Sequence, residues 1–152
     1  MTDIADLSAV ELSTQIRAKA LSPVEVTDAI LARIDQRADL NAFITITADE
    51  ARAEAKAAEA MVMAGGELPS LLGIPYSVKD LVNTAGVRTT MGSKIFETNV
   101  PKEDAVAVAR ARAAGAILVG KTTTPEFGHV QSATSPLFGR TLNPVDPAVT
   151  PG

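Results

Sequence analysis

The sequence predicts an α/β protein in which a helical N-terminal layer precedes part of a mixed, mainly parallel sheet flanked by helices. Two observations predict this fold class. Helix-start signals recur through residues 1–66, and residues 67–152 contain an apolar strand, a helix and a second apolar strand in that order. Strands joined by a crossover helix pair in parallel, and strands buried on both faces are continuous apolar runs.

The helix-start signals are capping boxes, in which a Ser or Thr is followed three residues later by Glu. They lie at residues 8–11, 22–25 and 47–50, and the second has proline at the first helical position. The hydroxyl of such a box accepts a hydrogen bond from the amide three residues on, and the Glu side chain accepts one from the cap amide. The third box predicts an Ala-rich helix that runs to about Ala64 and ends at Gly65.

Strands are predicted where β-branched and other apolar residues form short runs, at residues 42–46, 71–78 and 116–119. Between the last two runs, residues 104–114 are rich in Ala, Val and Arg and precede Gly115, which predicts the crossover helix and its C-terminal cap. No repeat or linker interrupts the chain. We therefore predict one domain segment over residues 1–152, helical over about 1–66 and α/β over about 67–152.

The composition argues against several classes of function. A net charge of −4 provides no attraction to phosphate, so no nucleic-acid partner is expected. No apolar run approaches the roughly 18–20 residues of a membrane span, so no membrane contact is expected. The absence of cysteine excludes disulfides, a thiolate nucleophile and Cys-based metal sites. A cytoplasmic location is expected.

Two apparent sites are set aside. Residues 115–122 satisfy the phosphate-binding pattern G-x-x-x-x-G-K-[ST], but their middle positions are Ala, Ile, Leu and Val. Such residues predict a buried strand where a phosphate cradle needs a flexible loop, and Pro125 obstructs a following helix. The single histidine, His129, has no second histidine or cysteine to share a metal, so we expect a surface or loop residue.

Lys79 ends an apolar strand and stands beside Asp80, so a salt-bridged or solvated lysine is one interpretation. Its neighbours Ile74 and Val78 predict instead an apolar setting. Desolvation disfavours the ammonium form and lowers the pKa of a buried lysine. A neutral lysine can take a proton from a serine and so support nucleophilic catalysis without histidine.

Residues 72–152 resemble the amidase signature family, and the likeness extends more loosely to the N-terminal helices. The first matching segment is Gly-Ile-Pro-Tyr-Ser-Val-Lys-Asp at residues 73–80, which contains Lys79. The other segments follow in the family's order, at residues 85–93, 104–110, 113–116, 120–128, 135–139 and 143–152. The joint order of these segments, rather than any one of them, makes the resemblance specific.

The resemblance implies an incomplete amidase signature fold and amide hydrolysis by a Ser–cis-Ser–Lys mechanism. Lys79 is then the general base, which acts through the serine of a cis peptide on a second, nucleophilic serine. Both serines belong to a Gly/Ser-rich loop expected after residue 152, so this chain supplies the base but not the serines. Ser77 and Ser93 lie outside that context and are not assigned as nucleophiles. Asp80 is expected to hold the turn.

The resemblance also implies a substrate-binding candidate. Family members commonly carry Asn where this chain has Thr123, near the substrate pocket. Thr keeps a hydroxyl but lacks the paired donor and acceptor of an amide, which affects substrate choice and not the reaction class. No cofactor and no metal are expected.

Three functions stay open. The first is hydrolysis of a small aryl or alkyl amide, and the second is the glutamine-hydrolysing subunit of a tRNA-dependent amidotransferase. The third is a truncated, non-catalytic fragment that binds a complementary half. The expected partners are a small-molecule amide and either the missing C-terminal part of the same domain or a second copy of the chain.

We predict no amide hydrolysis by residues 1–152 alone, because a lysine base without its serines has no group to deprotonate. Incubation of the purified chain with a chromogenic amide checks this, and a burst of released product contradicts it.

We also predict that the isolated chain is poorly stable or self-associates, because a sheet cut short leaves an unpaired, apolar edge. Light scattering and thermal unfolding check this expectation. A monodisperse monomer with a sharp two-state melt would show it to be wrong.

Overall fold

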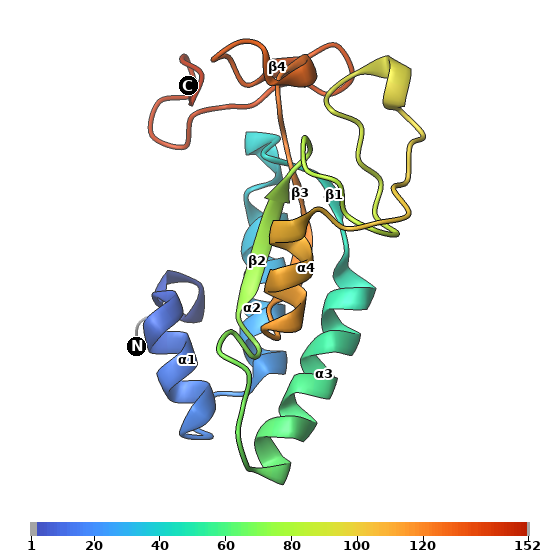
Figure 1. The fold of residues 1–152 in the computed structure, drawn as a ribbon. Helices are drawn as coiled ribbons and strands as arrows, with labels where there is room; N and C mark the ends of the chain where they lie inside the picture. The colour runs from blue at the N-terminus through green and yellow to red at the C-terminus, as the bar shows by residue number, and fades with distance from the viewer. Residues whose placement is uncertain (1–2, 152) are drawn as a thin grey trace. The chain divides into compact units, whose positions relative to one another are not determined.

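A computed structural model describes residues 3–151 of the chain (Figure 1). Its helices and strands alternate irregularly, and short 3-10 helices lie between them. The longer elements are α1 (Ala9–Arg17), α2 (Pro23–Gln36), β1 (Phe43–Ile46), α3 (Ala48–Ala64), β2 (Pro75–Lys79), α4 (Val106–Ala113), β3 (Ile117–Thr122), β4 (Thr134–Ser135) and β5 (Gly139–Arg140). The 3-10 helices are η1 (Ile4–Asp6), η2 (Ala38–Leu40), η3 (Lys94–Phe96) and η4 (Glu126–Gly128).

The three predicted capping boxes have different outcomes. Ser8 forms the complete box at the start of α1, since its hydroxyl accepts from the Glu11 amide and Glu11 accepts from the Ser8 amide. Ser22 forms half of one: its amide donates to the Glu25 carboxylate, but its hydroxyl accepts from the amide of Val24 instead. The prediction of a capping box at Thr47 is wrong. Its hydroxyl donates to the Leu118 carbonyl, at 2.7 Å, because the adjacent strand offers a buried acceptor.

The predicted strands are confirmed in position and corrected in extent. β1 corresponds to the run at residues 42–46, and β3 continues three residues beyond the predicted end at residue 119. β2 begins only at residue 75, because the residues before it form a turn in which the Ile74 amide donates to the Leu71 carbonyl. Gly73 has a φ of +77° there and packs against Pro23, so a side chain at this position would be strained and crowded.

The three longer strands form a mixed sheet in the order β1-β3-β2. β1 runs antiparallel to β3, with Thr45 opposite Lys121. β2 and β3 are parallel: the Ile117 amide donates to the Ile74 carbonyl, and the Asp80 amide donates to the Thr122 carbonyl further along both strands. The two strands are connected through α4, so the predicted strand–helix–strand unit is confirmed. Gly120 permits the close approach of β1, because a Cβ there would collide with the Thr45 carbonyl oxygen.

The chain divides into two compact units. Of the described residues, the first comprises 3–35, 47–76 and 109–119, and the second comprises 36–46, 77–108 and 120–151. The first unit contains an aliphatic core without aromatic side chains, as the composition predicts. Its buried members are Leu12, Ile16, Val26, Ala58, Val62, Leu72 and Ile74.

The second unit is held by buried polar groups to a greater degree. Fully buried polar side chains gather in its loops and at the end of β3: Asp80, Thr84, Thr89, Thr90, Ser93, Lys121 and Thr124. Buried polar groups must be hydrogen-bonded to be tolerated, so these residues specify the path of the loops between strands. No helix among residues 3–151 is long and apolar enough to cross a membrane.

Candidate active site

Lys79 is the last residue of β2, which lies at an edge of the three-stranded sheet. The adjacent parallel strand β3 ends at Thr122, and the Asp80 amide donates to the Thr122 carbonyl at 3.0 Å. Lys79 and Thr123 therefore follow the carboxyl ends of two neighbouring parallel strands. In α/β sheets, ligands commonly bind outside this edge.

The setting predicted for Lys79 is wrong in one respect. Its side chain is exposed, although Val78 beside it is buried. Side chains alternate between the two faces of a strand, so a buried neighbour does not imply a buried lysine. Within residues 3–151, the Lys79 ammonium makes no hydrogen bond or ion pair. The salt bridge to Asp80 that sequence alone also allowed is therefore not formed.

A tight turn carries the chain away from Lys79. The Val82 amide donates to the Lys79 carbonyl at 3.0 Å. Asp80, fully buried inside this turn, accepts hydrogen bonds on one carboxylate oxygen from the amide and the hydroxyl of Thr90. Its carbonyl accepts from the Met91 amide, also at 3.0 Å. Asp80 thus holds the turn to the next segment of chain, as expected of a structural neighbour.

The buried lysine of this unit is Lys121, to which the sequence alone assigned no role. Its side chain is 0% exposed. The ammonium donates to the Val82 carbonyl at 2.5 Å and to the hydroxyls of Thr84 and Thr89 at 2.8 and 2.9 Å. The pattern forms a strand with a lysine directed into the protein, so it cannot cradle phosphate. The sequence feature that could have indicated its burial is the apolar run at residues 116–119, which ends two residues before Lys121.

Burial lowers the pKa of Lys121 from its ordinary value of 10.5 to about 8, and the negative charges of Asp80 and Asp104 oppose this shift. Desolvation by burial is the largest of these contributions, so the pKa falls. The three acceptors that surround the ammonium are neutral oxygens. Lys121 is thus a charged group that the fold retains at an energetic cost.

Thr123 is partly buried and connected to the protein on both sides. Its amide donates to the Ala42 carbonyl at 2.9 Å, and its hydroxyl lies 2.7 Å from that of Thr141. The Thr141 hydroxyl donates in turn to the Asn41 carbonyl, so the Thr123 hydroxyl is left to donate to Thr141. Both acceptor lone pairs of the Thr123 hydroxyl remain for another group.

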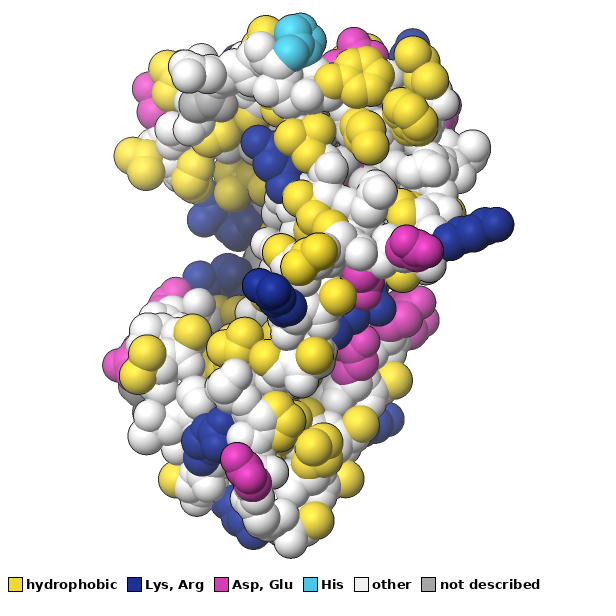
Figure 2. Space-filling model, in the orientation of Figure 1, with side chains coloured by type: hydrophobic (Ala, Val, Ile, Leu, Met, Phe, Trp, Pro, Cys, Tyr) yellow, Lys and Arg dark blue, Asp and Glu magenta, His cyan; other side chains and the backbone are white. Residues whose placement is uncertain are grey.

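The remaining polar candidates have structural roles or surface positions. Ser93 is fully buried, and its hydroxyl donates to Glu126 at 2.7 Å while accepting from the Ile95 amide. Ser77 is exposed on β2. His129 is also exposed, as predicted, and is the cyan side chain in Figure 2. No cluster of three or more His, Asp or Glu side chains in the described part of the chain could hold a metal.

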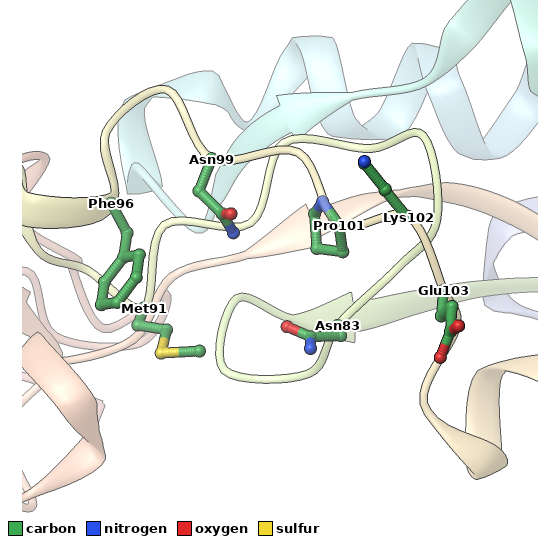
Figure 3. A pocket seen from close by; sticks show the side chains of 7 residues that line it. All are labelled: Asn83, Met91, Phe96, Asn99, Pro101, Lys102 and Glu103. Carbon is green, nitrogen blue, oxygen red and sulfur yellow. The ribbon is translucent and has the colours of Figure 1, made fainter.

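A surface pocket of about 370 Å³ lies in the second unit, beside the turn that follows Lys79. Figure 3 shows Met91 and Phe96 at one end of it and Lys102 and Glu103 at the other. Asn83, Asn99 and Pro101 complete the lining. Neither Lys79 nor Thr123 lines this pocket, so it is separate from the residues that the sequence predicted for the site.

We predict that Lys121 makes stability rise with pH. Its folded pKa of about 8 lies below the ordinary 10.5, so between these values the unfolded chain binds a proton that the folded chain has lost. The free energy of unfolding should increase by about 3 kcal/mol across that window, and the gain should disappear as pH falls through 8. Urea unfolding at pH 7.5, 9 and 10.5, with the chain dilute enough to stay monomeric, measures this.

Lys121→Met is the matched control, because methionine has a similar length and no charge. Other titrating groups contribute equally to both proteins and cancel in the difference. The free energy of unfolding of the natural chain should rise with pH relative to that of the variant. Parallel curves of this free energy against pH for the two proteins would contradict the prediction.

Comparisons with known proteins agree with this architecture. Residues 25–152 match the Amidase family. The chain is 42% identical over 151 residues to a glutamyl-tRNA(Gln) amidotransferase subunit from Geotalea daltonii, covering 99% of this chain and 31% of that protein. It is 48% identical over 133 residues to the Roseiflexus sp. subunit of the same name, covering 87% of this chain and 27% of that protein.

Solved structures show the same fold. One belongs to a vestigial protein complex described as revealing the origins of an s-triazine catabolic enzyme, with a TM-score of 0.88, 38% identity, and coverage of 93% of this chain and 31% of that one. A second is a bacterial aryl acylamidase of the amidase signature family, with a TM-score of 0.87, 29% identity, and coverage of 93% and 30%.

This chain therefore spans about a third of the length of the proteins that it matches. The helices, the mixed sheet and the order of the matched segments all agree with the fold class that the sequence predicts. The chain belongs to the amidase signature family.

Proposed function

We propose that the gene product carrying these residues hydrolyses the carbon–nitrogen bond of an amide, with Lys79 as its general base. The observation that carries this proposal is the state of the Lys79 ammonium. It lies at the carboxyl edge of two parallel strands, exposed and without a partner within residues 3–151, while the turn after it is firmly held. This position leaves the amine free to meet groups outside the described residues.

The proposed mechanism follows the family's Ser–cis-Ser–Lys scheme. Lys79, in its neutral form, takes a proton from the serine of the cis peptide, and that serine takes the proton of the nucleophilic serine. The nucleophile then adds to the amide carbonyl, the amine leaves with a proton, and water releases the acid from the acyl-enzyme. Backbone amides stabilise the oxyanion. The serines are expected in the Gly/Ser-rich loop, so this chain contributes the base.

Thr123 is proposed as a substrate-binding residue. Lys79 is the last residue of β2, and Thr123 directly follows β3. The Asp80–Thr122 hydrogen bond joins the ends of these two strands. The Thr123 hydroxyl donates to Thr141 and keeps both lone pairs, so Thr123 can act as an acceptor for a substrate N–H group. No cofactor is required by this chemistry.

A second candidate is the glutamine-hydrolysing subunit of a tRNA-dependent amidotransferase. Three relatives that carry an amidotransferase name are 42–44% identical over nearly the whole chain, whereas the solved aryl acylamidase and peptide amidase are 29% and 32% identical. This candidate requires partner subunits. The two candidates are separated by assaying a panel of simple amides against glutamine hydrolysis that depends on charged tRNA and partner proteins.

A non-catalytic fragment that binds its complementary half is the remaining proposal. This proposal predicts that separately produced residues 1–152 associate with the rest of the family domain. The alternative partner is a second copy of the chain, which would give a homo-oligomer. A cytoplasmic location remains an expectation for all three functions.

We predict that Lys79→Met in the gene product lowers kcat by at least about 10³-fold, because the variant lacks the amine proposed to take the serine proton. Folding should be unaffected, since the Lys79 side chain is exposed and makes no bond within the described residues. Steady-state hydrolysis of the best amide substrate measures the effect.

Lys56→Met serves as the control, because Lys56 is an exposed lysine on α3 and lies outside the proposed site. It should retain full activity. Hydrolysis by the Lys79→Met protein at the natural rate would exclude Lys79 as the base.

A further inference from the structure

Lys121 has no part in the proposed reaction, yet it is a fully buried charge, and such groups are costly to keep. An apolar side chain of similar length would fill the same volume without desolvating an ammonium. What the Lys121 ammonium contributes, and an apolar side chain cannot, is the donation of hydrogen bonds. Its three N–H donors meet three acceptors, the Val82 carbonyl and the hydroxyls of Thr84 and Thr89.

Those acceptors are arranged for a donor. The Thr84 hydroxyl donates to the Val82 carbonyl at 3.2 Å, and the Thr89 hydroxyl donates to the Val87 carbonyl at 3.1 Å. Each hydroxyl has thus committed its only hydrogen and presents lone pairs to Lys121. An ammonium satisfies all three oxygens at once, so the loop between residues 82 and 89 is closed around it.

The same contacts lead directly to Lys79. Val82 accepts from Lys121 through its carbonyl and donates through its amide to the carbonyl of Lys79. The turn that begins at Lys79 is therefore fixed at its far end by the buried ammonium. On its inner side the turn is fixed by Asp80, which is bonded to Thr90. The polypeptide around Lys79 cannot shift without breaking one of these bonds.

We propose that Lys121 is a positioning residue for Lys79, holding from inside the protein the turn that sets the place of the catalytic amine. It does not act on substrate, because its side chain is fully buried and its donors are all engaged. The catalytic part of this inference rests on the proposed function of Lys79. The part that concerns the turn does not.

Hydrogen exchange in the gene product tests the turn. In the Lys121→Met variant, amides in the peptide spanning residues 79–91 should exchange at least about tenfold faster, while α1 and α3 in the other unit keep their natural rates. Unchanged exchange in residues 79–91 would overturn the proposal. A uniform increase over the whole protein would also overturn it, since that result indicates general destabilisation.

A threonine series guards against a Lys121 variant that fails to fold. Thr89→Val removes one acceptor with little change of shape and should raise exchange in residues 79–91, whereas Thr89→Ser keeps the hydroxyl and should restore protection. Thr27→Val is the matched control, because Thr27 is equally buried and its hydroxyl has no partner within the described residues. Equal effects of Thr89→Val and Thr89→Ser would contradict the proposal.

Kinetics test the link to catalysis. Lys121→Met should lower kcat by about 10- to 100-fold with KM unchanged, because a small displacement of a catalytic group impairs reaction more than binding. Faster exchange with unchanged kcat would refute positioning, whereas an inactive natural protein would refute only the proposed function.

Discussion

The second unit depends on the satisfaction of one buried ammonium. Lys121 enters the unit from β3 and binds three oxygens of a loop that has little regular secondary structure of its own. Without a donor at this point, the Val82 carbonyl and two threonine hydroxyls would lose a buried partner, and each such loss is costly. The conformation of the loop is therefore specified by polar contacts, whereas the first unit relies on its aliphatic core.

This arrangement divides two tasks between two lysines on neighbouring parallel strands. Lys121 is buried, fully engaged and shifted in pKa, whereas Lys79 is exposed and has no partner within residues 3–151. The lowered pKa of Lys121 does not by itself make it a candidate base. A proton acceptor must reach its substrate, and the buried Lys121 side chain cannot. The buried lysine is better understood as support for the exposed one.

Much of the architecture was predictable from local patterns. The box at Ser8 and the Ala-rich run before Gly65 contain their stabilising partners within a few residues, so α1 and the end of α3 follow from sequence. The Thr47 hydroxyl was mispredicted because its partner, the Leu118 carbonyl, is remote in sequence. The start of β2 was misplaced for a similar reason, since the turn before it is held by the residues that follow α4, where the Leu71 amide donates to the Ala114 carbonyl.

The sequence by itself determined the family, the strand–helix–strand order and the place of Lys79 at a strand end, because these depend on motif order and on periodicity along the chain. Only the tertiary structure decided which lysine is buried. Burial of a side chain depends on which face of the sheet it occupies and on what covers that face. The acceptors of Lys121 lie 32 to 39 residues away from it, and no local pattern brings them together.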